Sequence, residues 1–171
     1  MIPTFEFQIR FAKPGDEPAI HDAHMRSIRE ICVKDHGTEE IKGWGHRELG
    51  DRWTKEIQNG TVWVVERNGC IHGVGYIRFY VSDESIKLGY IHALYLTPEA
   101  HGRGLGLRLL EILVDRAKLE RAKAVKLESS ITAHNFYLKF GFKDSGSMQT
   151  LDVGGYPVTA FPMRYELELP S

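Results

Sequence analysis

The sequence predicts an α/β fold in which helices flank a mixed, mostly antiparallel sheet. Segments that alternate apolar and polar residues are typical of strands, and they are interspersed with segments whose apolar residues recur at helical spacing. Asn68-Gly69 and Gly154-Gly155 each join two strand-like segments, as the turns of antiparallel hairpins do. The predicted order is a strand, two or three helices, three strands, a helix, a strand, a helix and two strands.

Length, composition and charge fit one globular domain over residues 1–171. Its 22 basic and 23 acidic residues nearly balance, so neither nucleic acid nor a membrane surface is an expected partner. Residues 1–10 do not resemble a secretion signal, and no stretch approaches the roughly 18 apolar residues of a membrane span. We therefore expect a cytoplasmic protein.

Cysteines and histidines form no metal-site pattern. Cys32 and Cys70 lie far apart without a C-x-x-C pair, and we expect both to be reduced thiols. His21 and His24 are three residues apart on an expected helix, but no carboxylate pattern such as H-E-x-x-H accompanies them. We therefore expect no bound metal.

The first third of the chain is expected to form one strand and three helices. Alternating residues predict a strand over 5–11, and apolar residues at helical spacing predict a helix over 16–33. Thr38 is expected to cap a second, short helix with acidic residues in its first turn. A third helical piece over 51–58 follows.

Strands dominate the rest of the chain. The Asn68-Gly69 turn separates expected strands over 61–67 and 70–80, and a further strand over 87–96 leads into a glycine-rich turn. An amphipathic helix follows this turn, and then a strand over 124–129. Residues 142–169 are expected to finish as two antiparallel strands.

The functional prediction depends on the glycine-rich turn. Gly102, Gly104 and Gly106 permit backbone angles and close approaches that side chains would block, and the first N–H groups of the following helix can bind a phosphate. Arg103 adds a positive charge. The dinucleotide pattern G-x-G-x-x-G fails because Leu107 occupies its third glycine position, and no nucleoside-triphosphate loop is present. A plain strand-to-helix turn is the alternative.

Two motifs, one in this turn and one after it, occur in the order and separation of a known family's signatures. Residues 101–106 read H-G-R-G-L-G and resemble the coenzyme A loop (Q/R)-x-x-G-x-(G/A) of the GCN5-related N-acetyltransferases (GNATs), with His101 at the first position. Residues 130–142 are similar to the family's second signature, N-x-x-A-x-x-(F/L)-Y-x-K-x-G-F, with Ser130 in place of Asn. The chain thus resembles a small bacterial GNAT of unassigned acceptor.

The resemblance implies a GNAT fold, with a sheet splayed between its fourth and fifth strands and acetyl-coenzyme A as co-substrate in the gap. It implies that the backbone of residues 94–96 pairs with the pantetheine arm and that the Leu96 N–H stabilises the oxyanion. The cofactor-binding residues that it implies are Leu94, Tyr95, Leu96, His101, Gly102, Arg103, Gly104, Leu105, Gly106, Leu107, Ser130 and Ala133.

Tyr137 occupies the position where the family often has its general acid. The departing thiolate has a conjugate-acid pKa near 8.5 on the cysteine reference, against about 10 for a phenol, so a nearby phenol can donate the proton. The alternative is a core residue packed with Phe136, Phe140 and Phe142.

His92 is the preferred candidate for the base that takes the proton of the attacking amine. It lies four residues before Leu96, and strand alternation would place both side chains on the same face as Leu94. A hydrogen-bonded structural histidine is the alternative. Glu128, at the end of the neighbouring strand, is the second choice of base, and solvent is the third.

The leading hypothesis is an enzyme that transfers an acetyl group from acetyl-coenzyme A to a primary amine by direct attack in a ternary complex. Neither cysteine lies in either motif, which disfavours a covalent intermediate. The expected acceptor is a small molecule or a peptide. The sequence does not determine whether the chain forms a homodimer. A non-catalytic acyl-coenzyme A sensor is the alternative, and a nicotinamide dinucleotide-binding domain is a third hypothesis.

Overall fold

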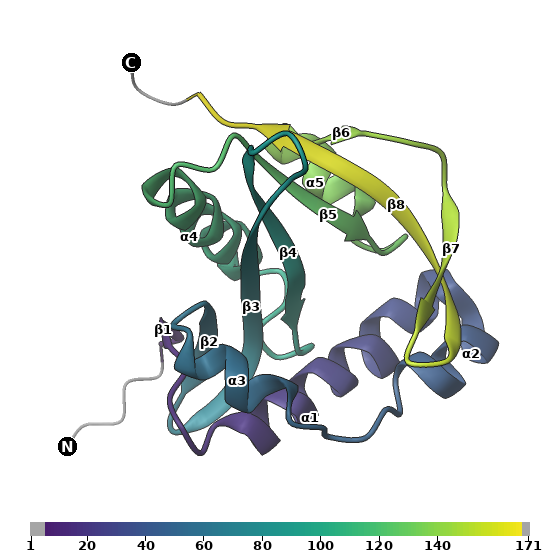
Figure 1. The fold of residues 1–171 in the computed structure, drawn as a ribbon. Coiled ribbons are helices and arrows are strands. Elements are labelled where there is room, and N and C mark those ends of the chain that lie inside the picture. The colour runs from purple at the N-terminus through teal and green to yellow at the C-terminus, as the bar shows by residue number, and fades with distance from the viewer. Residues whose placement is uncertain (1–5, 169–171) are drawn as a thin grey trace.

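The computed structural model describes residues 6–168, in which an eight-stranded sheet forms the centre of the molecule (Figure 1). The strands are β1 (Gln8–Phe11), β2 (Val62–Arg67), β3 (Cys70–Val81), β4 (Lys87–Leu96), β5 (Ala124–Ser129), β6 (Lys143–Asp144), β7 (Gln149–Val153) and β8 (Tyr156–Glu166). Their order is β1-β2-β3-β4-β5-β8-β6, and β7 pairs with β8. Only β4 and β5 run parallel among the described strands, which confirms the predicted mixed sheet.

Helices cover both faces of this sheet. They are α1 (Glu17–Ser27), a π-helical turn (Ile28–Cys32), α2 (Val33–Trp44), α3 (Arg52–Gln58), α4 (Leu105–Leu119) and α5 (His134–Phe140). α4 packs on one face of β3 and β4, whereas α1 and α3 cover a second hydrophobic cluster on the opposite face. Between residues 6 and 168, no helix is both long enough and apolar enough to cross a membrane.

The N-terminal helices differ from the prediction in their boundaries. The helix expected over 16–33 is α-helical only as far as Ser27, and the π-helical turn then connects it to α2. Gly37 has φ 79° and ψ 166°, so the backbone leaves helical geometry there. The short helix expected from Thr38 is consequently the later part of α2.

The strands follow the prediction more closely. The first strand, expected over 5–11, begins at Gln8, and Phe5 lies outside the described residues. The strands over 87–96 and 124–129 have the expected bounds, whereas the two-residue strand β6 was not expected. Both predicted hairpin turns have positive φ at their two central residues: Asn68 (53°), Gly69 (78°), Gly154 (64°) and Gly155 (90°).

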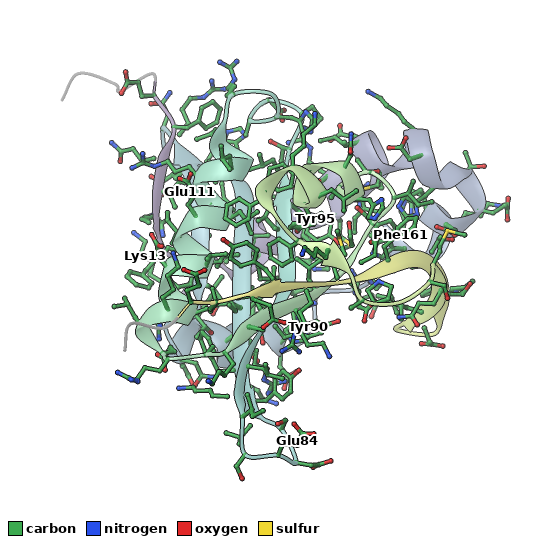
Figure 2. The ribbon with its side chains drawn as sticks, turned by 90° about the horizontal axis from the view of Figure 1, so that it is seen from above. Lys13, Glu84, Tyr90, Tyr95, Glu111 and Phe161 are labelled. Atoms are coloured by element: carbon green, nitrogen blue, oxygen red, sulfur yellow. The ribbon has the colours of Figure 1, made fainter. Side chains whose placement is uncertain are left out.

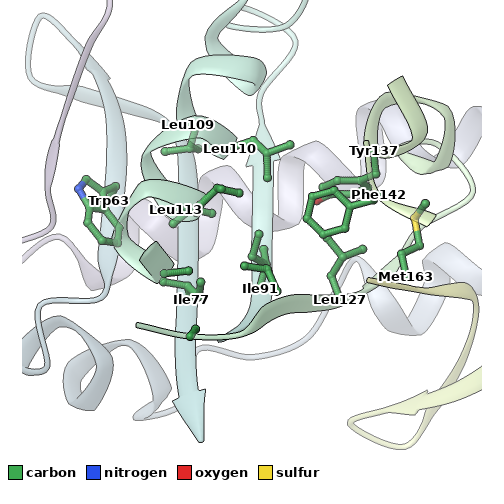
Figure 3. Close-up of a cluster of buried hydrophobic side chains, with 14 of the residues drawn as sticks. Trp63, Ile77, Ile91, Leu109, Leu110, Leu113, Leu127, Tyr137, Phe142 and Met163 are labelled. Atoms are coloured by element: carbon green, nitrogen blue, oxygen red, sulfur yellow. The ribbon is translucent and has the colours of Figure 1, made fainter. Parts of the chain in front are cut away.

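The largest core lies between α4 and the sheet (Figure 3). Leu109, Leu110 and Leu113 of α4 are fully buried in the same cluster as Ile77 and Ile91. Burying one such side chain contributes roughly 1.5–3 kcal/mol. This packing fixes the axis of α4, and with it the position of the glycine-rich turn at the start of the helix.

The β7–β8 hairpin lies over α2 (Figure 1). Val158 packs with Ile41 and Trp44 in a smaller core. Tyr156 covers Gly43 so closely that a Cβ at residue 43 would lie 1.8 Å from Cδ1 of the tyrosine. The hairpin can therefore rest on this part of α2 only because residue 43 is glycine.

We predict that Gly43→Ala lowers the free energy of unfolding by about 1–3 kcal/mol, because the new methyl group overlaps the base of the Tyr156 ring. Alanine favours a helix interior over glycine by roughly 1 kcal/mol, so the sign of the change distinguishes packing from propensity. Urea denaturation measures it. In a Tyr156→Ala background the same substitution should no longer destabilise the fold. An equal cost in both backgrounds would show that the contact does not matter.

Candidate active site

The glycine-rich turn between β4 and α4 has a backbone suited to anions. Gly102 and Gly104 have φ of 75° and 77°, in the left-handed region that glycine favours. Gly104 is also the N-cap of α4, and no side chain of the described residues caps this helix. The first N–H groups of α4 are thus available to an anion, and the helix dipole favours negative charge there.

A cleft of about 420 Å³ opens beside this turn. The predicted cofactor-binding residues that line it are Leu94, Tyr95, Leu96, His101, Gly102, Gly104, Gly106, Leu107, Ser130 and Ala133. Arg103 and Leu105 point elsewhere: Nε of Arg103 donates to the carbonyl of Glu99 at 2.9 Å, and Leu105 packs against the main core. The structure therefore brings most of the predicted set around one cleft.

The cleft is also lined by residues that the sequence did not assign to it. Ser27, Ile31 and Cys32 come from the end of α1 and the π-helical turn, and Phe136 comes from α5. Burial raises the pKa of the Cys32 thiol to about 11, so the thiol stays protonated at neutral pH and is a poor nucleophile. No sequence motif marks these positions, because helix packing alone places them here.

β4 and β5 diverge beside the cleft. Their parallel pairing ends at Ile91 and Leu127, which confirms the expected splay between the fourth and fifth strands. On the opposite edge of β4, the N–H of Thr97 donates to the carbonyl of His72 at 2.8 Å. Since N–H directions alternate along a strand, the N–H of Leu96 points the other way, into the gap.

A β-bulge lies at His92, where β4 begins to leave β5. Tyr76 of β3 pairs with Ala93, and Ile77 pairs with Ile91, so His92 has no partner on β3. The extra residue moves the side chains that follow it to the face of the sheet opposite to the one that regular alternation would give. Ile91 belongs to the core under α4, whereas Ala93 belongs to the core under α1 and α3.

The predicted shared face of His92, Leu94 and Leu96 is therefore wrong. Leu94 and Leu96 pack toward the core under α4. The His92 ring instead stacks on Tyr76, with 5.2 Å between centroids, and lies 4.5 Å from the ring of Tyr90. Sequence alternation assumes an unbroken pleat, and the bulge breaks it.

His92, Tyr137 and Glu128 line one narrow space of about 30 Å³ between β4 and β5. Burial, together with the guanidinium groups of Arg52 and Arg78, lowers the pKa of His92 to about 4. The imidazole is therefore neutral at physiological pH. The structure thus brings the predicted acid and both candidate bases to the same opening.

Tyr137 belongs to the core as well as to this gap. Its side chain is 5% exposed, and the ring of Phe142 lies edge-on at 5.4 Å (Figure 3). The ring of Phe136 lies edge-on at 5.3 Å. Burial raises the pKa of its phenol, so the hydroxyl keeps its proton. Packing holds the ring at the gap, so a core role and an acid role are compatible.

A second pocket of about 220 Å³ adjoins the gap. Its walls come from α1, α2, α3, β4, β5 and the β7–β8 hairpin, and polar side chains that line it are His24, Arg47, Arg52, His92, Glu128 and Thr159. Tyr95 and Ser130 line the cleft, the gap and this pocket, so the three spaces adjoin one another along a path past these two residues. Tyr90, another lining residue, and Tyr95 lie near the centre of the molecule (Figure 2).

Comparisons with known proteins agree with this arrangement. A family model described as an acetyltransferase (GNAT) domain matches residues 32–167. A search of curated proteins found no match. Many solved structures share the fold, and three of them illustrate the likeness.

A GCN5-related N-acetyltransferase from Rhodopseudomonas palustris aligns with a TM-score of 0.79 and 19% identity, covering 98% of this chain and 99% of that one. A putative acetyltransferase from Salmonella typhimurium, solved with acetyl-coenzyme A, aligns with a TM-score of 0.70 and 20% identity, covering 97% of this chain and 96% of that one. A polyamine N-acetyltransferase from Drosophila melanogaster, which forms N-acetylagmatine, aligns with a TM-score of 0.70 and 15% identity, covering 95% of this chain and 100% of that one.

We predict that His24 makes the fold less stable in mild acid. His24 is 3% exposed, and burial lowers its pKa well below the usual value near 6.5. Below about pH 6.5 the unfolded chain gains a proton that the folded chain does not, so the free energy of unfolding should fall as the pH falls. Its limiting slope is about 1.4 kcal/mol per pH unit.

Urea denaturation at about pH 7.5 and about pH 5.5 measures this slope. His24→Phe keeps an aromatic ring and removes the titrating group. The free energy of unfolding of this variant should therefore depend less steeply on pH, by the slope that one proton contributes. Identical slopes in the two proteins would mean that His24 takes up its proton without unfolding.

Proposed function

Because the chain belongs to the GNAT acetyltransferase family, we propose that this acyltransferase moves the acetyl group of acetyl-coenzyme A onto a primary amine in a ternary complex. The observation that carries the proposal is that the cleft, the gap and the second pocket adjoin one another past Tyr95 and Ser130. The acetyl-coenzyme A in the Salmonella structure and the polyamine activity of the Drosophila enzyme support the two substrate classes.

The coenzyme is proposed to occupy the cleft beside the glycine-rich turn. Its pyrophosphate would accept hydrogen bonds from the first N–H groups of α4, next to Gly104. Its pantetheine arm would run along the unpaired edge of β4, where β5 has diverged. The N–H of Leu96 would then donate to the thioester oxygen as negative charge develops there, a contribution of roughly 3 kcal/mol to transition-state stabilisation.

The amine is proposed to enter from the second pocket and attack the thioester carbon directly. The C–N bond forms, the C–S bond breaks, and coenzyme A leaves as a thiolate. An acetyl-cysteine intermediate is disfavoured, because the Cys32 thiol has a pKa of about 11 and Cys70 is exposed at the start of β3. The Tyr137 hydroxyl is the proposed proton donor to the thiolate.

The proton lost by the amine is proposed to pass to His92. This imidazole lies at the junction of the gap and the second pocket, and it is neutral at working pH. Its pKa of about 4 makes it a weak acceptor for the proton of a free ammonium ion with a pKa near 10.4. His92 therefore acts after the amine has added to the carbonyl, when the nitrogen proton is more acidic, and it passes the proton to solvent.

We predict that acetyl-coenzyme A stabilises the fold more than NAD or ATP does. A ligand at 100 times its dissociation constant should add roughly 2.7 kcal/mol. Thermal shift with the three ligands measures the effect, and thiol release with a panel of amines tests turnover. Stabilisation by acetyl-coenzyme A without turnover of any amine would indicate a sensor and refute the transferase.

Two variants of the glycine-rich turn test whether the phosphates of the coenzyme bind there. Asp and Asn both tolerate the left-handed backbone of Gly104 and have the same size, but only Asp adds a like charge beside the pyrophosphate. Gly104→Asp should therefore lose more acetyl-coenzyme A affinity than Gly104→Asn. Equal affinities in calorimetry would put the phosphates elsewhere.

We predict that His92→Gln lowers kcat/KM roughly 10²–10⁴-fold by a similar factor at every pH between about 5.5 and 8. His92 has a pKa of about 4, so it can accept a proton throughout this range and would lose that ability only as the pH falls through about 4. Any rise of the wild-type rate above neutral pH should follow the amine, and so persist in the variant.

Glu128→Gln and Tyr137→Phe are assayed beside His92→Gln to test the other proposed proton carriers. A loss in Glu128→Gln with none in His92→Gln would assign the base to Glu128, and no loss in either would leave solvent. Tyr137→Phe keeps the ring packing and should lower kcat while coenzyme affinity stays unchanged. Full activity would make Tyr137 a core residue only.

A further inference from the structure

Two arginines in the second pocket have no carboxylate partner. Arg47 and Arg52 are half-buried, and neither forms an ion pair within 4.0 Å among residues 6–168. By contrast, the part-buried Arg10 pairs with Asp16 at 2.7 Å, and Arg116 pairs with Glu120 at 3.1 Å. The carboxylate of Glu56 offsets part of the charge of Arg52 without forming an ion pair with it. A cation withdrawn from water without a direct ion-pair partner is costly, so the two arginines indicate a site for an external anion.

The loop that carries Arg47 is fastened by hydrogen bonds. Nε2 of His21 bonds the carbonyl of Arg47 at 2.8 Å, and Nη1 of Arg29 donates to the carbonyl of Gly45 at 2.8 Å. Nε of Arg47 itself donates to the carbonyl of Trp44 at 3.0 Å. These bonds hold the side chain in place and leave its terminal N–H groups for a ligand.

Arg52 is positioned by aromatic rings instead. Its guanidinium lies 4.7 Å from the ring centroid of Trp53 and 5.4 Å from that of Tyr76. Stacking covers the faces of the guanidinium and leaves the N–H donors along its edge. Burial lowers the pKa of both arginines, and the charge of Arg52 lowers that of Arg47 a little further.

His24 adds an independent sign of a ligand in the same pocket. Its Nε2 is buried and has no hydrogen-bond partner within the described chain, although buried polar atoms are nearly always paired. The imidazole packs 4.4 Å from the ring of Tyr95, which also lines the cleft. Glu128 is the carboxylate that lines this pocket, and Gln149 donates to it at 3.0 Å.

Resting on the proposed function, we propose that Arg47 and Arg52 bind a carboxylate of the acceptor, which is therefore a small amino acid rather than a polyamine. The carboxylate would lie between the two guanidinium groups and His24, and the amine would point toward Glu128 and the gap. A pocket of about 220 Å³ suits a molecule of this size. A polyamine would instead place a second cation against two arginines, which like-charge repulsion disfavours.

The test compares acceptors that differ only in their acid group. A panel of amino acids, their carboxamides and the matched decarboxylated amines is assayed for thiol release at saturating acetyl-coenzyme A. The carboxylates should have KM values at least about tenfold lower than the carboxamides. Arg47→Gln and Arg52→Gln should each raise the KM for a carboxylate roughly 10–100-fold, as expected for charged hydrogen bonds, and change the KM for its carboxamide little.

Arg78→Gln is the matched control. It removes a nearby guanidinium that pairs with Glu56 at 3.9 Å and does not line the pocket, so it should leave the preference for carboxylates intact. Melting temperature and acetyl-coenzyme A affinity show whether each variant is folded.

The outcomes separate the two proposals. Equal or better turnover of carboxamides or polyamines overturns the carboxylate site and leaves acetyl transfer standing. Failure of every carboxylate-bearing amine to react, while acetyl-coenzyme A still stabilises the fold, also overturns it. If the wild-type protein does not bind acetyl-coenzyme A, the proposed function itself is refuted.

Discussion

The site depends on one interruption of backbone hydrogen bonding, the end of pairing between β4 and β5 after Ile91 and Leu127. In a continuous sheet β5 would take up the N–H of Leu96, and the cleft would not exist. An unpaired backbone group costs roughly 1–3 kcal/mol unless water or a ligand satisfies it, so the open edge offers hydrogen-bonding groups to water or a ligand. Leucine packing under α4 and aromatic packing around Tyr137 hold the two strands in place where hydrogen bonds no longer do.

The bulge at His92 changes which side chains of β4 lie on each face of the sheet. Beyond it, Leu94 and Leu96 lie toward the glycine-rich turn, and Tyr95 packs toward the opposite face, where it lines the second pocket as well as the edge of the cleft. One added residue therefore lets a single strand present its backbone to the cleft and a polar side chain to the second pocket. Bulges beside active sites commonly redirect a side chain in this manner.

Charge is distributed unevenly along the path. The N-terminus of α4 favours anions at one end, and Arg47 and Arg52 do so at the other. In the middle, His92 and Tyr137 are both uncharged at working pH, and Glu128 is the carboxylate that lines the same space. If the proposed transfer takes place, the low dielectric of the partly buried gap would let the N–H of Leu96 stabilise a developing oxyanion more strongly than it would in water.

The sequence by itself determined the hairpins, the bounds of β4 and β5, the backbone of the glycine-rich turn and, through two motifs, the family. These features depend on local properties: glycine at positive φ, alternation along a strand, and residues at fixed spacing. It did not determine the face of His92, the wall formed by Cys32, or the pairing of Arg47 with Arg52 in one pocket. The tertiary structure decided these, because a bulge depends on the register with β3 and a pocket forms only where distant helices, strands and a hairpin pack together.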